Sequence, residues 1–238
     1  MPSLCAPFAA FLLFFSLASL PASTGFAAGT GEPFAKWENE IAAFEKADQL
    51  RAPEKGGIVF VGSSSIRLWK TLAQDLPEYR TLNRGFGGSQ VADSVHFADR
   101  IIFPYEPSMV VLYAGGNDIN SGKSAERVFD DLKTFLTTVR ERLPNATIGY
   151  ISVAGNPARW SQIEKIRTLN QLAREYIEKQ PRMKFIDVHS RMLGADGLPL
   201  PGIFVDDKLH MNAEGYKIWT ATVRPYLAEA REKETAKE

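Results

Sequence analysis

Short apolar runs alternate along the chain with longer segments in which apolar residues recur every three or four positions. Runs rich in β-branched and aromatic residues are typical of strands buried on both faces, and the longer spacing is typical of amphipathic helices. The predicted strands are Ile58 to Val61, Tyr79 to Asn83, Met109 to Tyr113, Thr147 to Val153 and Lys184 to Val188. The predicted helices are Pro33 to Arg51, Ile66 to Asp75, Gln90 to Ile102, Ala125 to Leu143, Trp160 to Lys179 and Ala213 to Glu232.

Strands that alternate with helices through short connections need right-handed crossovers, which produce a parallel sheet with helices on both faces. We therefore expect a three-layer α/β/α sandwich with about five parallel strands. Sites in such sheets form just beyond the carboxyl ends of the strands. The residues that follow the predicted strands include Ser64, Gly88, Asn117, Asp207 and His210. The sequence therefore predicts a polar site at one edge of the sheet.

The first part of the chain differs from the rest. Phe8 to Leu20 is an apolar stretch without charge, too short to span a bilayer comfortably, and Gly25-Phe26-Ala27 offers the small residues that a signal peptidase reads. We expect a signal peptide over residues 1–27, one domain over 28–238, and a secreted or periplasmic protein. Because no Lys or Arg precedes the apolar stretch, an uncleaved anchor stays open as an alternative.

Composition narrows the possible partners. The 238 residues are 45% hydrophobic, enough for one full core, and Lys+Arg and Asp+Glu both total 28. A net charge of zero gives no basic field for nucleic acid or anionic lipid, so we expect neither partner, and no membrane span after cleavage. The single cysteine, Cys5, would leave with the signal peptide, which excludes disulfides and a cysteine nucleophile from the domain. The oligomeric state stays unknown.

The candidate chemistry begins at three consecutive serines, Ser63 to Ser65, directly after the first predicted strand. Serines in this position are often plain helix caps, and a serine becomes a nucleophile only when a base takes its proton. His210 is the candidate base, and Asp207 lies three residues before it, where one turn can bring its carboxylate to the imidazole.

Acyl transfer also needs hydrogen-bond donors for the oxyanion. The backbone amides of Ser64 and Gly88 and the side-chain amide of Asn117 could supply three. Gly87 is the alternative to Gly88 because the two glycines are adjacent.

These blocks resemble those of the SGNH hydrolases, also called GDSL lipases or esterases, over the stretch from Val61 to His210. The segments GGND and DKLHMNAEGY carry the likeness most closely. The resemblance implies a flavodoxin-like sheet, no metal or other cofactor, and hydrolysis of esters or thioesters through an acyl-enzyme. By position it implies that Ser64 is the nucleophile, that Gly88 and Asn117 are oxyanion donors, and that Asp207 and His210 are the acid–base pair.

One position departs from the family pattern. The first block normally reads Gly-Asp-Ser, whereas this chain has Gly62-Ser63-Ser64. A hydroxyl can accept a backbone hydrogen bond similar to that of the missing aspartate, and the sequence leaves the role of Ser63 open. The change also makes Ser65 an alternative nucleophile.

The sequence thus predicts a serine esterase for a small-molecule or carbohydrate ester, with short acyl chains favoured because no long apolar lid segment is present. A lysophospholipid or a thioester stays open as substrate. The alternatives are an acyltransferase to a carbohydrate acceptor and a non-catalytic relative that binds a glycan or lipid. Arg67, Trp69, Arg159 and Trp160 are further candidates to line the cleft.

Overall fold

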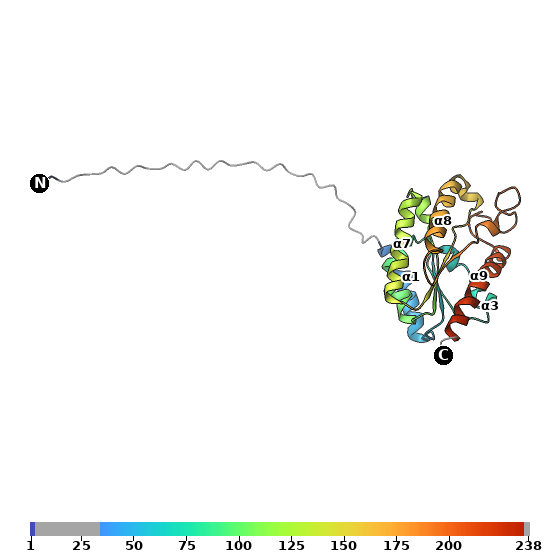
Figure 1. Cartoon of the computed structure of the whole chain (residues 1–238), viewed down its shortest axis with the longest axis horizontal. Coiled ribbons are helices and arrows are strands. Elements are labelled where there is room, and N and C mark those ends of the chain that lie inside the picture. The colour runs from blue at the N-terminus through green and yellow to red at the C-terminus, as the bar shows by residue number, and fades with distance from the viewer. Residues whose placement is uncertain (3–33, 236–238) are drawn as a thin grey trace. The chain divides into compact units, whose positions relative to one another are not determined.

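A sheet of five parallel strands, in the order β2-β1-β3-β4-β5, forms the centre of the computed structural model (Figure 1). The structure describes residues 1–2 and 34–235, so the rest of the predicted signal peptide lies outside the described residues. The strands are β1 (Ile58–Gly62), β2 (Thr81–Gly85), β3 (Met109–Tyr113), β4 (Thr147–Ile151) and β5 (Met183–Ile186). This strand order is the flavodoxin-like one and confirms the predicted fold class.

Helices cover both faces of the sheet (Figure 1). One apolar core lies between the sheet and α1 (Glu38–Leu50), α4 (Val91–His96), α5 (Ala98–Ile101), α7 (Ala125–Arg142) and α8 (Ile163–Ile177). The other lies between the sheet and α2 (Ser64–Arg67), α3 (Leu72–Asp75) and α9 (Ala213–Thr235). Among the described helices, none combines the length and apolar character needed to cross a membrane.

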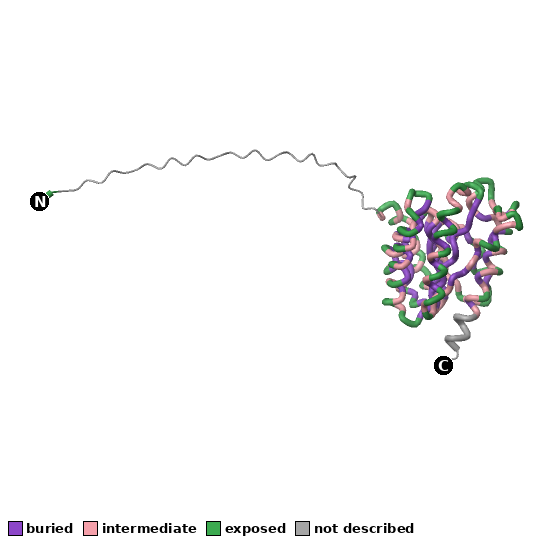
Figure 2. The backbone as a smooth tube through the Cα atoms, turned by 45° about the horizontal axis from the view of Figure 1, so that its top comes forward, coloured by how far each residue is buried: buried purple, intermediate pink, exposed green. Residues whose placement is uncertain are grey.

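Strand β1 lies inside the sheet, where it pairs with β2 on one side and β3 on the other. All five of its residues are buried, and Figure 2 shows the buried segments in the middle of the domain with exposed helices around them. Val61 contributes to one core and Phe60 to the other, as the alternating side chains of a strand require. The strand therefore gives the serines that follow it a rigid base.

Several predicted boundaries were wrong, and three of them bear on the elements around the site. The helix expected over Ile66 to Asp75 is two short helices, because Asn83 Nδ2 donates to the carbonyl oxygens of Ile66 (2.6 Å) and Trp69 (3.3 Å) where α2 ends. The helix expected over Gln90 to Ile102 is interrupted at Phe97. Strand β2 begins two residues later than expected, since its pairing with β1 sets Thr81 opposite Ile58.

Candidate active site

The first serine block lies where β1 turns into α2. Gly62 has φ +131°, and a Cβ there would lie 2.0 Å from the carbonyl oxygen of Tyr113 on the neighbouring strand, so only glycine fits. The Ser63 amide donates to the same carbonyl over 3.0 Å. Ser64 is the first residue of α2, and its Oγ lies 2.8 Å from His210 Nε2. The close approach of β1 and β3 thus fixes where Ser64 begins the helix.

His210 and Asp207 form a compact pair on the loop before α9. Their side chains meet over 2.5 Å, from His210 Nδ1 to Asp207 Oδ2, and Asp207 Oδ1 accepts from the backbone amides of Leu209 (2.8 Å) and His210 (2.9 Å). The hydrogen bond from the His210 amide, more than any other contact, lowers the pKa of the Asp207 carboxyl to about 2. An ionised Asp207 holds the proton on Nδ1, which leaves the lone pair of Nε2 facing the Ser64 hydroxyl.

The neighbouring serines are oriented differently. The carbonyl of Ser65 accepts from the Tyr216 hydroxyl over 2.9 Å, and no hydrogen bond joins the Ser65 hydroxyl to His210. The distance to His210 therefore favours Ser64 over Ser65 as the nucleophile. Ser63 takes the N-cap position of α2, but its side chain makes no capping hydrogen bond. The Ser63 carbonyl instead accepts from the amides of Ile66 and Arg67.

Gly88 lies on the loop between β2 and α4, exposed and with φ +72°. The amide of the preceding glycine, Gly87, donates to Glu40 Oε2 of α1 over 3.1 Å, whereas that of Gly88 makes no hydrogen bond to a described residue. A Cβ at Gly88 would lie 3.3 Å from the ring of Trp37. Glu40 of α1 thus binds the amide of Gly87, while the amide of Gly88 stays available to a ligand.

Asn117 is carried by α6 (Gly116–Asn120), a short helix that follows β3 and that the sequence did not predict. Asn117 Nδ2 donates to the Ser89 carbonyl over 3.0 Å, and Asn117 Oδ1 accepts from Arg159 Nη1 over 2.9 Å. The side-chain amide of Asn117 has two N–H groups. One donates to the Ser89 carbonyl, and the second can donate to a substrate oxygen.

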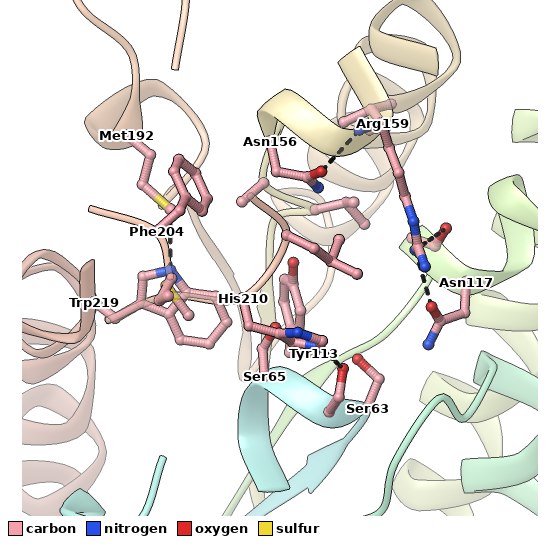
Figure 3. Close-up of a pocket in the computed structure, with 17 residues that line it drawn as sticks. Ser63, Ser65, Tyr113, Asn117, Asn156, Arg159, Met192, Phe204, His210 and Trp219 are labelled. Carbon is pink, nitrogen blue, oxygen red and sulfur yellow. Dashed lines mark hydrogen bonds between the residues drawn. The ribbon is translucent and has the colours of Figure 1, made fainter. Parts of the chain in front are cut away.

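Part of this site lines a pocket of about 30 Å³ (Figure 3), and Gly88 and Asp207 are not among the lining residues. Ser64, Asn117 and His210 all line it. Of the residues that the structure describes, no three His, Cys, Asp or Glu side chains are grouped so as to hold a metal ion. The arrangement brings together a hydroxyl, a base with an ionised partner, and amide donors, which is the set of groups that acyl transfer requires.

Comparison with known proteins identifies the family. The model of the GDSL-like Lipase/Acylhydrolase family matches residues 59–218, well over half of the chain. The chain belongs to this family. It is therefore an SGNH-type ester hydrolase, which confirms the resemblance drawn from the sequence blocks.

Individual relatives agree with the family match. The chain is 28% identical over 193 residues to platelet-activating factor acetylhydrolase IB subunit alpha1 of Bos taurus, covering 76% of this chain and 78% of that protein. The human protein of the same name is 28% identical over 196 residues, with the same coverage.

Solved structures show the same fold. A GDSL-like lipase from Bacteroides thetaiotaomicron superposes with a TM-score of 0.67 at 19% identity, covering 83% of this chain and 98% of that one. A carbohydrate esterase family 3 protein from Talaromyces cellulolyticus gives 0.61 at 17% identity, covering 74% and 99%.

Sequence reasoning left out two contacts of this GDSL-like site. Glu40 was assigned only to an amphipathic helix, yet it holds the glycine loop. Arg159 was a candidate for lining the cleft, and it does so while also binding the side chain of Asn117. Trp69, by contrast, is only 1% exposed and belongs to the core. No local pattern marks either contact, because each joins residues more than 40 positions apart.

Proposed function

We propose that the protein is a serine esterase that cleaves short acyl esters through an acyl-enzyme. The observation that carries the proposal is the continuous chain of hydrogen bonds from Ser64 Oγ to His210 (2.8 Å) and from His210 to Asp207 (2.5 Å). A surface histidine without a catalytic role has no reason to be held in this way at both ring nitrogens.

In the first half of the reaction, Ser64 Oγ forms a bond to the ester carbonyl carbon while its proton passes to His210 Nε2. The carbonyl electron pair moves onto oxygen, which accepts hydrogen bonds from the amides of Ser64 and Gly88 and from Asn117 Nδ2. The intermediate then expels the alcohol, which takes the proton from His210. Water repeats these steps on the acyl-enzyme, releases the acid and restores Ser64.

The size of the pocket supports a short acyl group. A volume of about 30 Å³ compares with roughly 10–15 Å³ needed for one water molecule on the same measure. Met192, Phe204 and Trp219 supply an apolar wall for the acyl carbons. The two kinds of relative named above, an acetylhydrolase and a carbohydrate esterase, are consistent with this size.

The mechanism can be tested by labelling with a fluorophosphonate probe, which reacts only with an activated serine. We expect the wild-type protein and Ser65→Ala to be labelled and Ser64→Ala not to be. Labelling of Ser64→Ala but not of Ser65→Ala would assign the nucleophile to Ser65 instead. An unlabelled wild-type protein would favour a non-catalytic relative that binds a glycan or lipid.

Substrate preference requires a separate assay. Hydrolysis of p-nitrophenyl esters from acetate to octanoate should be fastest for the shortest chains and fall once the acyl group exceeds the pocket. A profile that rises toward octanoate would contradict the short-acyl proposal. Adding a carbohydrate acceptor and analysing the products separates hydrolysis from acyl transfer.

We also propose that residues 1–27 are a signal peptide that directs the protein to a secreted or periplasmic location. The support is the apolar stretch from Phe8 to Leu20 and the small residues at Gly25 and Ala27. N-terminal sequencing of protein recovered from the cell exterior or periplasm should begin at Ala28. Recovery of the intact N-terminus in the membrane fraction would indicate an anchor.

A further inference from the structure

The active-site pocket has two unlike walls (Figure 3). Met192, Phe204 and Trp219 form an apolar wall, while Arg159 lies on the opposite side next to Asn117, with Asn156 between the two walls in this view. Among the residues that line the pocket there is no Asp or Glu. The second wall therefore presents a cation to the substrate.

The Arg159 side chain is held in place by uncharged groups. The residue lies in η3 (Pro157–Gln162), where its backbone amide donates to Asn156 Oδ1 over 3.0 Å. Arg159 Nη1 donates to the Gly116 carbonyl (3.3 Å) and to Asn117 Oδ1 (2.9 Å). Burial lowers the pKa of the guanidinium, and no described carboxylate lies within ion-pair distance of it. Burial removes water that would solvate the guanidinium charge, and no anionic side chain of the described residues replaces that water. A partly buried cation without a counter-ion is therefore costly.

The other edge of the same guanidinium is unoccupied. Nε and Nη2 make no hydrogen bond to any residue in the described part of the chain, although Arg159 lines the pocket. This edge presents two parallel N–H groups, the geometry that binds a carboxylate or a phosphate through two oxygens. Since Nη1 is fixed on Asn117, the free edge is oriented before the substrate arrives.

We propose that Arg159 determines specificity by binding an anionic group of the substrate, so that the preferred esters carry a carboxylate or a phosphate close to the scissile bond. The inference rests on the proposed esterase function and deepens it. Residue 159 would then combine two contacts: Nη1 positions the oxyanion asparagine, and the Nε and Nη2 edge pairs with the substrate.

The test compares esters that differ only in charge. For the alcohol side the pair is 4-acetoxybenzoate and its methyl ester, with 4-acetoxyphenyl phosphate as the phosphate counterpart. For the acyl side the pair is mono-4-nitrophenyl glutarate and its methyl ester. Each kcat/KM is divided by the rate of hydroxide-catalysed hydrolysis to remove intrinsic reactivity. We expect at least one anionic ester to be preferred about 10- to 100-fold at low salt.

Three variants separate the pairing from other effects. Arg159→Gln should reduce the preference to near unity, and Arg159→Lys should retain part of it because a charge stays without the planar fork. The control Arg142→Gln removes the same charge from an exposed ion pair with Asp99 at the far end of α7, and should leave the preference unchanged. Every Arg159 variant should also lose kcat on neutral esters through Asn117, so the ratio between paired esters is the readout.

The two proposals fail in different ways. Equal use of charged and neutral esters by the wild-type protein, or a preference that survives in Arg159→Gln, overturns the role of Arg159 and leaves the esterase intact. If no ester is hydrolysed, the proposed function fails, and calorimetry with the same ligands decides the inference. Tighter binding of 4-acetoxybenzoate or 4-acetoxyphenyl phosphate than of the methyl ester, lost in Arg159→Gln, supports it, and equal binding overturns it.

Discussion

Replacing Asp207 by asparagine removes one negative charge and puts an NH₂ group in place of one carboxylate oxygen, next to the histidine of the proposed mechanism. The carboxylate accepts three hydrogen bonds, from His210 Nδ1 (2.5 Å) and from the backbone amides of Leu209 (2.8 Å) and His210 (2.9 Å). An asparagine has only one oxygen with which to replace both carboxylate oxygens. Asp207→Asn must therefore give up part of this arrangement.

Both orientations of the asparagine are unfavourable. If its oxygen keeps the backbone amides, its NH₂ group faces His210 Nδ1 and forces the proton onto Nε2, which can then no longer accept the proton of Ser64. If its oxygen faces His210, its NH₂ group opposes two backbone donors. The first orientation retains more hydrogen bonds, so we expect the tautomer that cannot act as base to dominate.

The magnitude follows from two contributions. The attraction between the carboxylate and the imidazolium formed in the transition state is about 4 kcal/mol at an effective dielectric of roughly 20 and about 1 kcal/mol in water, for centres ~4 Å apart. The Asp207 side chain is 45% exposed, so the true value lies between these limits. With the tautomer penalty added, we expect kcat to fall by about 10³- to 10⁴-fold.

The assay is p-nitrophenyl acetate hydrolysis under saturating and single-turnover conditions. The matched control is Asp206→Asn, which removes the same charge from the adjacent exposed position and should change kcat by less than about twofold. A decrease of less than tenfold in Asp207→Asn, or equal decreases in both variants, would refute the reasoning that Asp207 acts by orienting His210.

Three other outcomes follow from the geometry. Asn117→Ala should lower kcat by about 10²- to 10³-fold with little change in KM, and a loss below fivefold would exclude it as an oxyanion donor. Gly62→Ala should lower the melting temperature strongly because its Cβ would lie 2.0 Å from the Tyr113 carbonyl, whereas Gly122→Ala, with nothing within 4 Å, should lower it less. Backbone hydrogen bonds, chiefly from the histidine amide, lower the Asp207 pKa to about 2 from the usual value of about 3.9. Folding thus favours the ionised form, and this stability is complete above about pH 4 and lost toward pH 2, so the difference in urea midpoint between wild type and Asp207→Asn should narrow over that range.

The sequence was enough to predict the three layers of the fold, because the spacing of apolar residues distinguishes buried strands from amphipathic helices within each segment. Strand β3 was predicted with its observed ends, Met109–Tyr113. The predicted end of a helix was wrong where a side chain from a distant part of the sequence forms hydrogen bonds with the backbone there. The carbonyls at the end of α2 are bound by Asn83, a residue 17 positions later, so no reading of the helix itself could predict where it stops.

The same division holds at the site. The Asp207 and His210 pair is a local feature, three residues apart, and the sequence by itself determined it together with the family blocks around Gly88 and Asn117. The family blocks already favoured Ser64 over Ser65, and the tertiary structure added the contact with His210, since adjacent helical residues point about 100° apart and only the packing sets which of them faces the histidine. It also decided that Arg159 contacts Asn117 at one wall of the pocket. Side-chain direction and long-range contact depend on how the strands pack, and that information is not contained in any one segment.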